Sequence, residues 1–151
     1  MLVRDATPED FAELFALDQL CFVPGISWSR AELGYFLRYP GNISLVAERE
    51  AGKIAGFAIA GPRKRSGAPQ ARLITIDVHP EMRRRHIGHI LMLAMEERVR
   101  AVGAASMRLE VAIDNLAAIQ FYAQHGFHRI GRIPGYYLSR IDALVMEKTL
   151  Q

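Results

Sequence analysis

The chain has 151 residues, of which 50% are hydrophobic and 23% are charged, and these values are ordinary for one soluble globular domain, here expected to span residues 1–151. Acidic residues near the N-terminus stand where a signal peptide needs an apolar core, and no apolar run approaches membrane-spanning length, so we expect a cytoplasmic protein without a membrane partner. The single cysteine excludes an intramolecular disulfide, and the net charge of +3 favours an anionic ligand.

The first half of the chain predicts a strand, two helices and then three strands. Leu2–Arg4 is a short strand, Thr7 caps the first helix, and Ser29 with Glu32 forms the capping box of a second helix that ends near Leu37. An apolar stripe marks the first helix: Phe11, Leu14, Leu17 and Leu20. The three strands are Ile43–Glu48, Ile54–Ala60 and Arg72–Val78, with a basic loop at Gly61–Gln70. Consecutive strands of this kind imply antiparallel hairpins.

The second half alternates helices and strands. An apolar helix face is expected at Ile87, Leu91, Met95, Val99 and Val102, and Gly103 ends that helix. The elements that follow are the strand Ser106–Val111, the helix Asn115–His125, a strand near Phe127–Gly131, a loop at Gly135–Tyr137 and a strand at Ala143–Lys148. Strand–helix–strand units imply parallel pairing with right-handed crossovers. The fold class is therefore α/β, with a mixed antiparallel and parallel sheet flanked by helices.

The segment Val78–Leu91 has the pattern of an anion site. A strand leads through His79-Pro80 into three consecutive arginines, Arg83–Arg85, and then into a helix whose first turn contains Gly88. The first N–H groups of a helix have no partner within the helix, and the helix dipole is positive there, so phosphate is the expected ligand. A solvated basic surface is the alternative reading of the arginines.

A second segment, Asn115–Phe127, follows the strand that carries Glu110. Its sequence is Asn-Leu-Ala-Ala-Ile-Gln-Phe-Tyr-Ala-Gln-His-Gly-Phe, with Tyr122 two helical turns after Asn115. Together with Arg83–Gly88, this block resembles the GNAT superfamily of acetyl-CoA-dependent N-acetyltransferases over essentially the whole chain. The resemblance implies the GNAT fold, in which the two central strands splay apart and admit the pantetheine arm.

The resemblance also implies how acetyl-CoA, the co-substrate, is bound, without a metal. Backbone groups of Ile76, Asp77 and Val78 are expected at the pantetheine amides, with the Val78 N–H on the thioester carbonyl. The pyrophosphate loop is expected to comprise Arg83, Arg84, Arg85, His86, Ile87, Gly88 and His89, and Asn115 is expected beside the pantetheine arm. His86 stands where the family usually has glycine, and a positive φ there is costlier for histidine than for glycine.

Glu110 is the candidate general base and Tyr122 the candidate general acid. Strand alternation places Glu110 on the same face as Arg108. The pairing of Glu110 with Tyr122 resembles the RimI type of the superfamily, in which the acceptor is the α-amine of a protein N-terminus. In that type, Trp28, Tyr136 and Tyr137 would bind the acceptor.

Several alternatives stay open. The acceptor can be a small amine. A basic nucleic-acid-binding module that uses Arg63–Arg65 together with Arg83–Arg85 is a rival of a different class, although no helix-turn-helix or stacking motif supports it. Glu110 can be a merely paired carboxylate and Tyr122 a core tyrosine, and the substrate-side aromatic residues can be core plugs. Cys21 is expected to be a buried apolar residue, and the histidines have no carboxylate that would complete a metal site.

Overall fold

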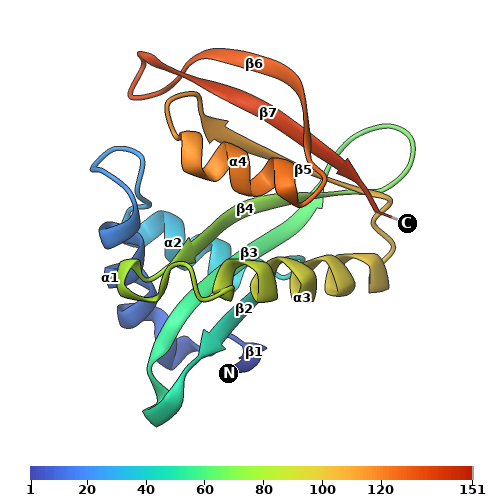
Figure 1. The fold of residues 1–151 in the computed structure, drawn as a ribbon. Coiled ribbons are helices and arrows are strands. Elements are labelled where there is room, and N and C mark those ends of the chain that lie inside the picture. The colour runs from blue at the N-terminus through green and yellow to red at the C-terminus, as the bar shows by residue number, and fades with distance from the viewer. Residues whose placement is uncertain (151) are drawn as a thin grey trace.

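Seven strands form one mixed sheet in the computed structural model, which describes residues 1–150 (Figure 1). Their order across the sheet is β1-β2-β3-β4-β5-β7-β6. The strands are β1 (Leu2–Asp5), β2 (Ile43–Glu48), β3 (Ile54–Arg63), β4 (Gln70–Val78), β5 (Ser106–Ala112), β6 (His128–Tyr137) and β7 (Ile141–Thr149). The expected mixed sheet is confirmed, because β4 and β5 pair in parallel and all other neighbours are antiparallel.

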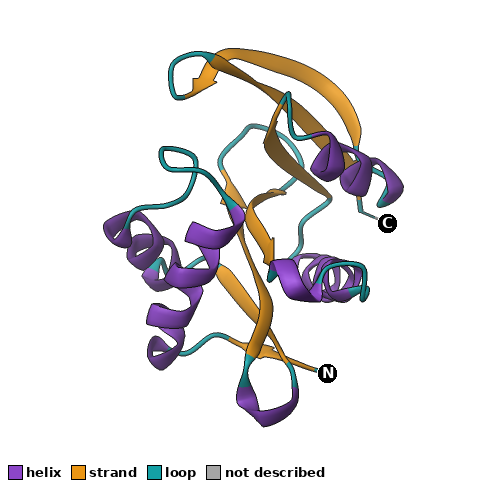
Figure 2. Cartoon of the chain, turned by 60° about the vertical axis from the view of Figure 1, so that its left-hand side comes forward, coloured by secondary structure: helices purple, strands orange, loops and turns teal. Residues whose placement is uncertain are grey.

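Helices cover both faces of this sheet (Figure 2). One face carries α1 (Phe11–Cys21) and α2 (Arg30–Arg38), and the other carries α3 (Ile87–Ala101) and α4 (Leu116–Gln124). Short 3-10 turns are η1 (Pro8–Asp10), η2 (Glu50–Gly52) and η3 (Pro80–Met82). The capping box at Ser29 is present, since the Ser29 side chain accepts from the Glu32 N–H and the Glu32 side chain accepts from the Ser29 N–H.

The central parallel pair is short. Only Gln70–Arg72 of β4 pairs with β5, through Ser106–Arg108, although both strands continue well beyond this point. Figure 1 shows β5 turning away from β4 toward the β6–β7 hairpin. The splayed central strands that the family resemblance implied are therefore present, and they leave unpaired backbone along the C-terminal part of β4.

A bulge in β4 changes which side chains face each layer of helices. Ile59 pairs with Thr75, whereas Ala60 pairs with Leu73, so Ile74 is the extra residue. Before the bulge, Leu73 packs in the core beneath α3. After the bulge, Thr75 and Asp77 are the buried residues, and they point toward the opposite layer, where α1 lies.

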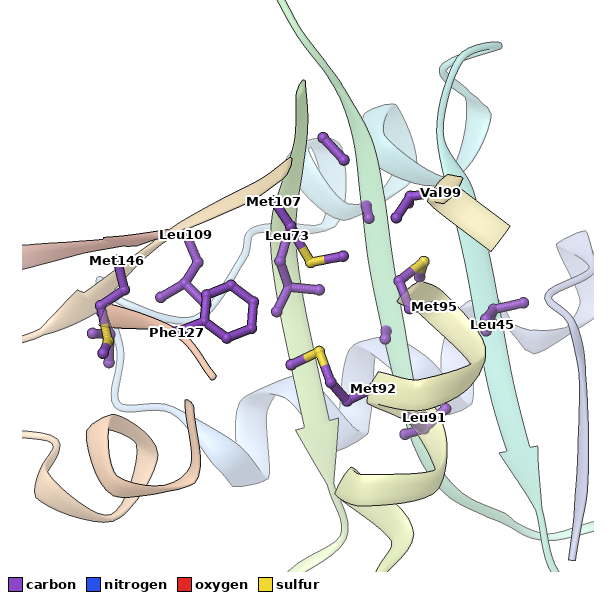
Figure 3. Packing of buried hydrophobic residues seen from close by; sticks show 14 of the residues in the cluster. Leu45, Leu73, Leu91, Met92, Met95, Val99, Met107, Leu109, Phe127 and Met146 are labelled. Atoms are coloured by element: carbon purple, nitrogen blue, oxygen red, sulfur yellow. The ribbon is translucent and has the colours of Figure 1, made fainter. Parts of the chain in front are cut away.

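The larger core lies between the sheet and the helices α3 and α4 (Figure 3). Leu91, Met92 and Met95 of α3 are fully buried in the same cluster as Leu73 of β4, and Phe127 joins Met107, Leu109 and Met146 on the neighbouring strands. Full burial of one such side chain contributes about 1.5–3 kcal/mol. This packing fixes α3, and with it the loop that precedes α3.

Four expectations need correction. Leu20 and Val102 are 61% and 74% exposed, because each lies at the end of its helix beyond the packed face. Tyr136 and Tyr137 are in strand β6 rather than in a loop, because β6 runs on past an irregularity after Ile133 until Tyr137 pairs with Ile141 of β7. β5 and β6 do not pair, since β7 lies between them.

No helix in residues 1–150 is both long enough and apolar enough to span a bilayer.

Candidate active site

A cleft of about 860 Å³ opens where β4 and β5 part. It reaches from the N-terminus of α3 and the face of α4, past the ends of both strands, to the loop Val23–Trp28 and the β6–β7 hairpin. Most of the predicted site residues line it: Trp28, Ile76, Asp77, Val78, Arg83, Gly88, Glu110, Asn115, Tyr122, Tyr136 and Tyr137. The other predicted residues lie outside the cleft lining, in the adjoining loop and the first turn of α3: Arg84, Arg85, His86, Ile87 and His89.

Free backbone on β4 faces the gap. The His79 N–H donates to Ala55 C=O at 2.8 Å, so by the alternation of an antiparallel ladder the N–H and C=O of Val78 point away from β3. The Val78 C=O receives the Cys21 thiol and Arg83 Nε, each at 3.3 Å. The Val78 N–H therefore points into the space that β5 has left.

The loop before α3 contains two strained residues. Arg84 and His86 have φ values of 65° and 61°, in the left-handed region that favours glycine. The sequence raised a positive φ at His86 only as a condition, and the structure meets it, whereas the positive φ of Arg84 was not foreseen. His86 makes no side-chain cap to α3, so the first N–H groups of this helix of 15 residues stay free beside exposed arginines. This arrangement fits a pyrophosphate.

Asn115 caps α4, because its Oδ1 accepts from the Ala118 N–H at 3.2 Å. The cap uses only the oxygen, and Asn115 also lines the cleft. Gly88 lies opposite: a Cβ on it would sit 3.1 Å from the Phe121 ring. A larger residue at this position would therefore push α3 and α4 apart at the mouth of the cleft.

Glu110 is held by an arginine that sequence reasoning missed. Arg72 Nε donates to Glu110 Oε1 at 2.9 Å, while Arg108 Nε is 4.0 Å from Oε2. The Tyr136 hydroxyl lies 3.5 Å from both Glu110 Oε1 and Arg72 Nη2. With its side chain only 9% exposed, Glu110 is an oriented carboxylate at the cleft. Arg72 and Arg108 are register partners on adjacent strands, and it is this register, which the sequence alone does not give, that brings Arg72 to Glu110.

Tyr122 lies across the cleft on α4. Its ring packs edge-on against Phe121 and Phe127, with centroid distances of 5.5 and 5.8 Å. Burial raises the pKa of the Tyr122 phenol well above its usual value, and the negative charge of Asp77 raises it further. The hydroxyl is therefore protonated over the whole working range of pH, as a proton donor must be.

The substrate-side aromatic residues are both packed and cleft-lining. Trp28 is half-buried and meets Phe36 edge-on at 4.8 Å, and its backbone N–H donates to Asp18 Oδ2 at 2.7 Å. Tyr136 and Tyr137 meet edge-on at 4.9 Å. Trp28 thus packs against the smaller core on one side and lines the cleft on the other. In residues 1–150 no group of three or more His, Cys, Asp or Glu side chains is placed to hold a metal ion.

The comparison with known families agrees with this geometry. The family described as "Acetyltransferase (GNAT) family" matches residues 11–127. The chain belongs to this family. It therefore carries the domain of an acetyl-CoA-dependent N-acetyltransferase.

Relatives place the chain among RimI-like members. It is 30% identical over 143 residues to "N-alpha-acetyltransferase RimI" of Mycobacterium tuberculosis, covering 94% of this chain and 88% of that protein. It is also 30% identical over 154 residues to "Uncharacterized protein ML0378" of Mycobacterium leprae. That match covers all of this chain but only 41% of the length of the relative.

A solved structure shares the whole fold. The ribosomal-protein-alanine N-acetyltransferase from Brucella melitensis superimposes with a TM-score of 0.83 at 27% identity, covering 99% of this chain and 100% of that one.

Proposed function

We propose that this protein transfers the acetyl group of acetyl-CoA to the α-amine of a protein N-terminus. The main observation behind this proposal is that Glu110, Tyr122 and Val78, whose N–H points away from β3, all line one cleft at the parting of β4 and β5. The M. tuberculosis and B. melitensis relatives are named as an N-alpha- and an alanine N-acetyltransferase, and these names support this acceptor. An α-amine, with a pKa of about 8 against about 10.4 for lysine, also needs only a modest base.

Glu110 is the base in this proposal. Arg72 engages Oε1 and holds the carboxylate, which leaves Oε2 to take a proton from the acceptor ammonium, directly or through water. The nitrogen lone pair so released attacks the thioester carbonyl carbon and forms the new C–N bond.

The Val78 N–H donates to the carbonyl oxygen as negative charge develops there, and a preorganised donor of this kind contributes about 3 kcal/mol in acyl transfer. The C–S bond then breaks with its electron pair on sulfur. Tyr122 gives its proton to that thiolate, so CoA leaves as the neutral thiol, and the second amine proton passes to solvent.

The residues available to hold acetyl-CoA are those around the N-terminus of α3. Free N–H groups of Ile87, Gly88 and His89 would bind the pyrophosphate, with Arg83–Arg85 on the ribose phosphates. Ile76 and Val78 backbone groups and Asn115 would bind the pantetheine arm, as a pseudo-strand beside β4.

The test is a competition between acceptors with acetyl-CoA in excess. A peptide that starts with alanine is mixed with a counterpart whose N-terminus is blocked and which carries one internal lysine, and spermidine is added in a third arm. Mass spectrometry reads the product. We expect the alanine α-amine to be acetylated first. Preferred acetylation of lysine or of spermidine would overturn the acceptor and leave the family unchanged.

A further inference from the structure

Two carboxyl groups are buried together behind the cleft wall. Asp18 of α1 is 0% exposed and Asp77 of β4 is 1% exposed. The β4 bulge at Ile74 is what turns Asp77 toward α1. The proposed acetyl transfer uses neither carboxyl side chain.

Each carboxyl has one satisfied oxygen. The Trp28 N–H donates to Asp18 Oδ2 at 2.7 Å, and the Thr75 hydroxyl donates to Asp77 Oδ1 at 2.5 Å. The remaining oxygens, Asp18 Oδ1 and Asp77 Oδ2, are buried without another hydrogen-bond partner among the described residues. α1 touches the end of β4 at this place, since the Cys21 thiol, about one helical turn after Asp18, donates to the Val78 C=O at 3.3 Å. One proton placed between the two unpartnered oxygens would satisfy both.

Elementary electrostatics favours that proton. Two adjacent carboxylates out of water cannot both stay ionised at modest cost, so one takes a proton and donates it to the other. Burial raises the pKa of Asp77 well above its ordinary value, and the neighbouring Asp18 raises it further. The result is a pair with one proton and one negative charge at neutral pH.

We propose that Asp18 and Asp77 share this proton and that the resulting carboxyl–carboxylate hydrogen bond positions the acceptor wall of the cleft. The chain of contacts is short. Asp77 directly precedes Val78, whose N–H faces the gap, and Asp18 holds the backbone of Trp28 on the acceptor side. The pair thus ties the loop that carries Trp28 to the strand that would hold the thioester.

The groups that face the pair come from every neighbouring element. They are the Cys21 thiol of α1, Thr75 of β4, the Arg83 guanidinium of the following loop and the Tyr122 phenol of α4. Arg83 is the one cation among these groups, and it offsets the single charge of the pair. Loss of the shared proton gives the pair a second negative charge, and no second cation in this set offsets it. The two carboxylates then repel each other and move apart, which releases Trp28.

The proton itself is tested without any activity. Carbon-13 NMR of protein labelled at aspartate carboxyl carbons, with D18N and D77N for assignment, follows both groups through a pH titration. We expect one macroscopic step near or below the ordinary Asp range and a second step displaced well above it. Two independent steps, both in the ordinary range, would overturn the shared proton.

The positioning role rests on the proposed function and is tested by kinetics with the alanine peptide. Asp77→Asn keeps the shape and supplies an N–H donor to Asp18 at every pH. The quantity to follow is the ratio of two KM values for the peptide, that of the parent protein divided by that of D77N, because the titration of the peptide amine cancels in this ratio. We expect the ratio to rise at alkaline pH, where the parent loses its shared proton. Loss of one proton limits the rise to about tenfold per pH unit.

A ratio that stays flat while the NMR shows the shared proton leaving would overturn the positioning role. Asp77→Ala is the counterpart of D77N, because alanine offers Asp18 no hydrogen-bond donor at any pH. For D77A we expect a raised KM for the peptide at all pH values, with a smaller change in kcat. If D77A does not fold, the D77N ratio still decides. If no peptide is acetylated at all, the proposed acceptor fails, and the NMR titration judges the pair on its own.

Discussion

Arg72 Nε donates to Glu110 Oε1 at 2.9 Å, across the point where the two central strands part. Arg72 is the last residue of β4 that pairs with β5, and its register partner is Arg108, two residues before Glu110. The contact therefore holds the candidate base at the edge of the gap rather than within the paired sheet. It also makes the side chain of Glu110 dependent on a residue of the other strand.

The dependence predicts coupling between the two residues. Glu110→Gln should lower kcat roughly a hundredfold or more, as removal of a general base does. Arg72→Ala should lower kcat by less, and should add little in the E110Q background, because its effect passes through Glu110. Steady-state kinetics of the double-mutant cycle measures this. Arg98→Ala, which removes the exposed ion pair to Asp5, is the control that should leave kcat unchanged. Additive losses would show that Arg72 acts independently.

Tyr122→Phe should lower kcat roughly a hundredfold while CoA binding stays near that of the parent. The ring contacts to Phe121 and Phe127 remain in this variant, so only the proton donor is lost. Calorimetric titration of CoA and steady-state turnover separate the two effects. Tyr39→Phe, at an exposed tyrosine, is the control. Parent-like turnover of Y122F would exclude Tyr122 as the acid.

His86→Gly should keep or tighten binding of CoA, because glycine adopts φ 61° without strain and lets phosphate approach the backbone. Gly88→Ala should weaken it, since the added Cβ meets the Phe121 ring at 3.1 Å. Calorimetric titration of CoA into both variants and the parent measures the two opposite changes in affinity. A large loss in H86G would mean that the imidazole itself contacts the cofactor.

The raised pKa of Asp77 predicts how stability depends on pH. Above the ordinary Asp value of 3.8, the unfolded chain releases this proton while the folded protein keeps it. The folded state thus binds more protons in that window, so the free energy of unfolding falls as pH rises toward the raised pKa. Asp10 and Asp142 have lowered pKa values and act in the opposite sense, below 3.8. Urea unfolding across pH should show a flatter dependence in D77N; an unchanged slope would count against a raised pKa.

Cys21 should react slowly with iodoacetamide at neutral pH. Burial raises the pKa of its thiol to about 11, and the charge of Asp77 adds to this effect. Labelling followed by mass spectrometry should show a rate that increases up to that pH. Fast labelling at neutral pH would show that the wall around Cys21 opens readily.

Sequence patterns were sufficient for the features that depend on local spacing. The alternation in Ser106–Ala112 places Glu110 and Arg108 on one face, and Arg83–His89 forms the expected loop and helix start. The position of a family glycine raised the question of a positive φ at His86, which the structure answers with φ 61°.

The contacts that define the site could not be read in the same way. Arg72 and Glu110 meet only because β4 and β5 share three paired residues, and Asp77 faces α1 only because a bulge at Ile74 reverses the alternation. One signal for the buried pair was present: Asp18 lies one helical turn after Leu14, on the apolar stripe of α1. A carboxyl at a core position implies a buried partner, but a single sequence does not say which residue it is.

The position of β7 has a consequence for the order in which the protein can fold. β7 lies inside the sheet, between β5 and β6, although it is made after both of them. Until Ile141–Thr149 emerges during synthesis, β5 has no partner beyond Arg108, and β6 has no strand to pair with. The half of the sheet that carries Glu110 and the tyrosines must therefore wait for the last strand, so a nascent chain presents two open strand edges before the cleft exists.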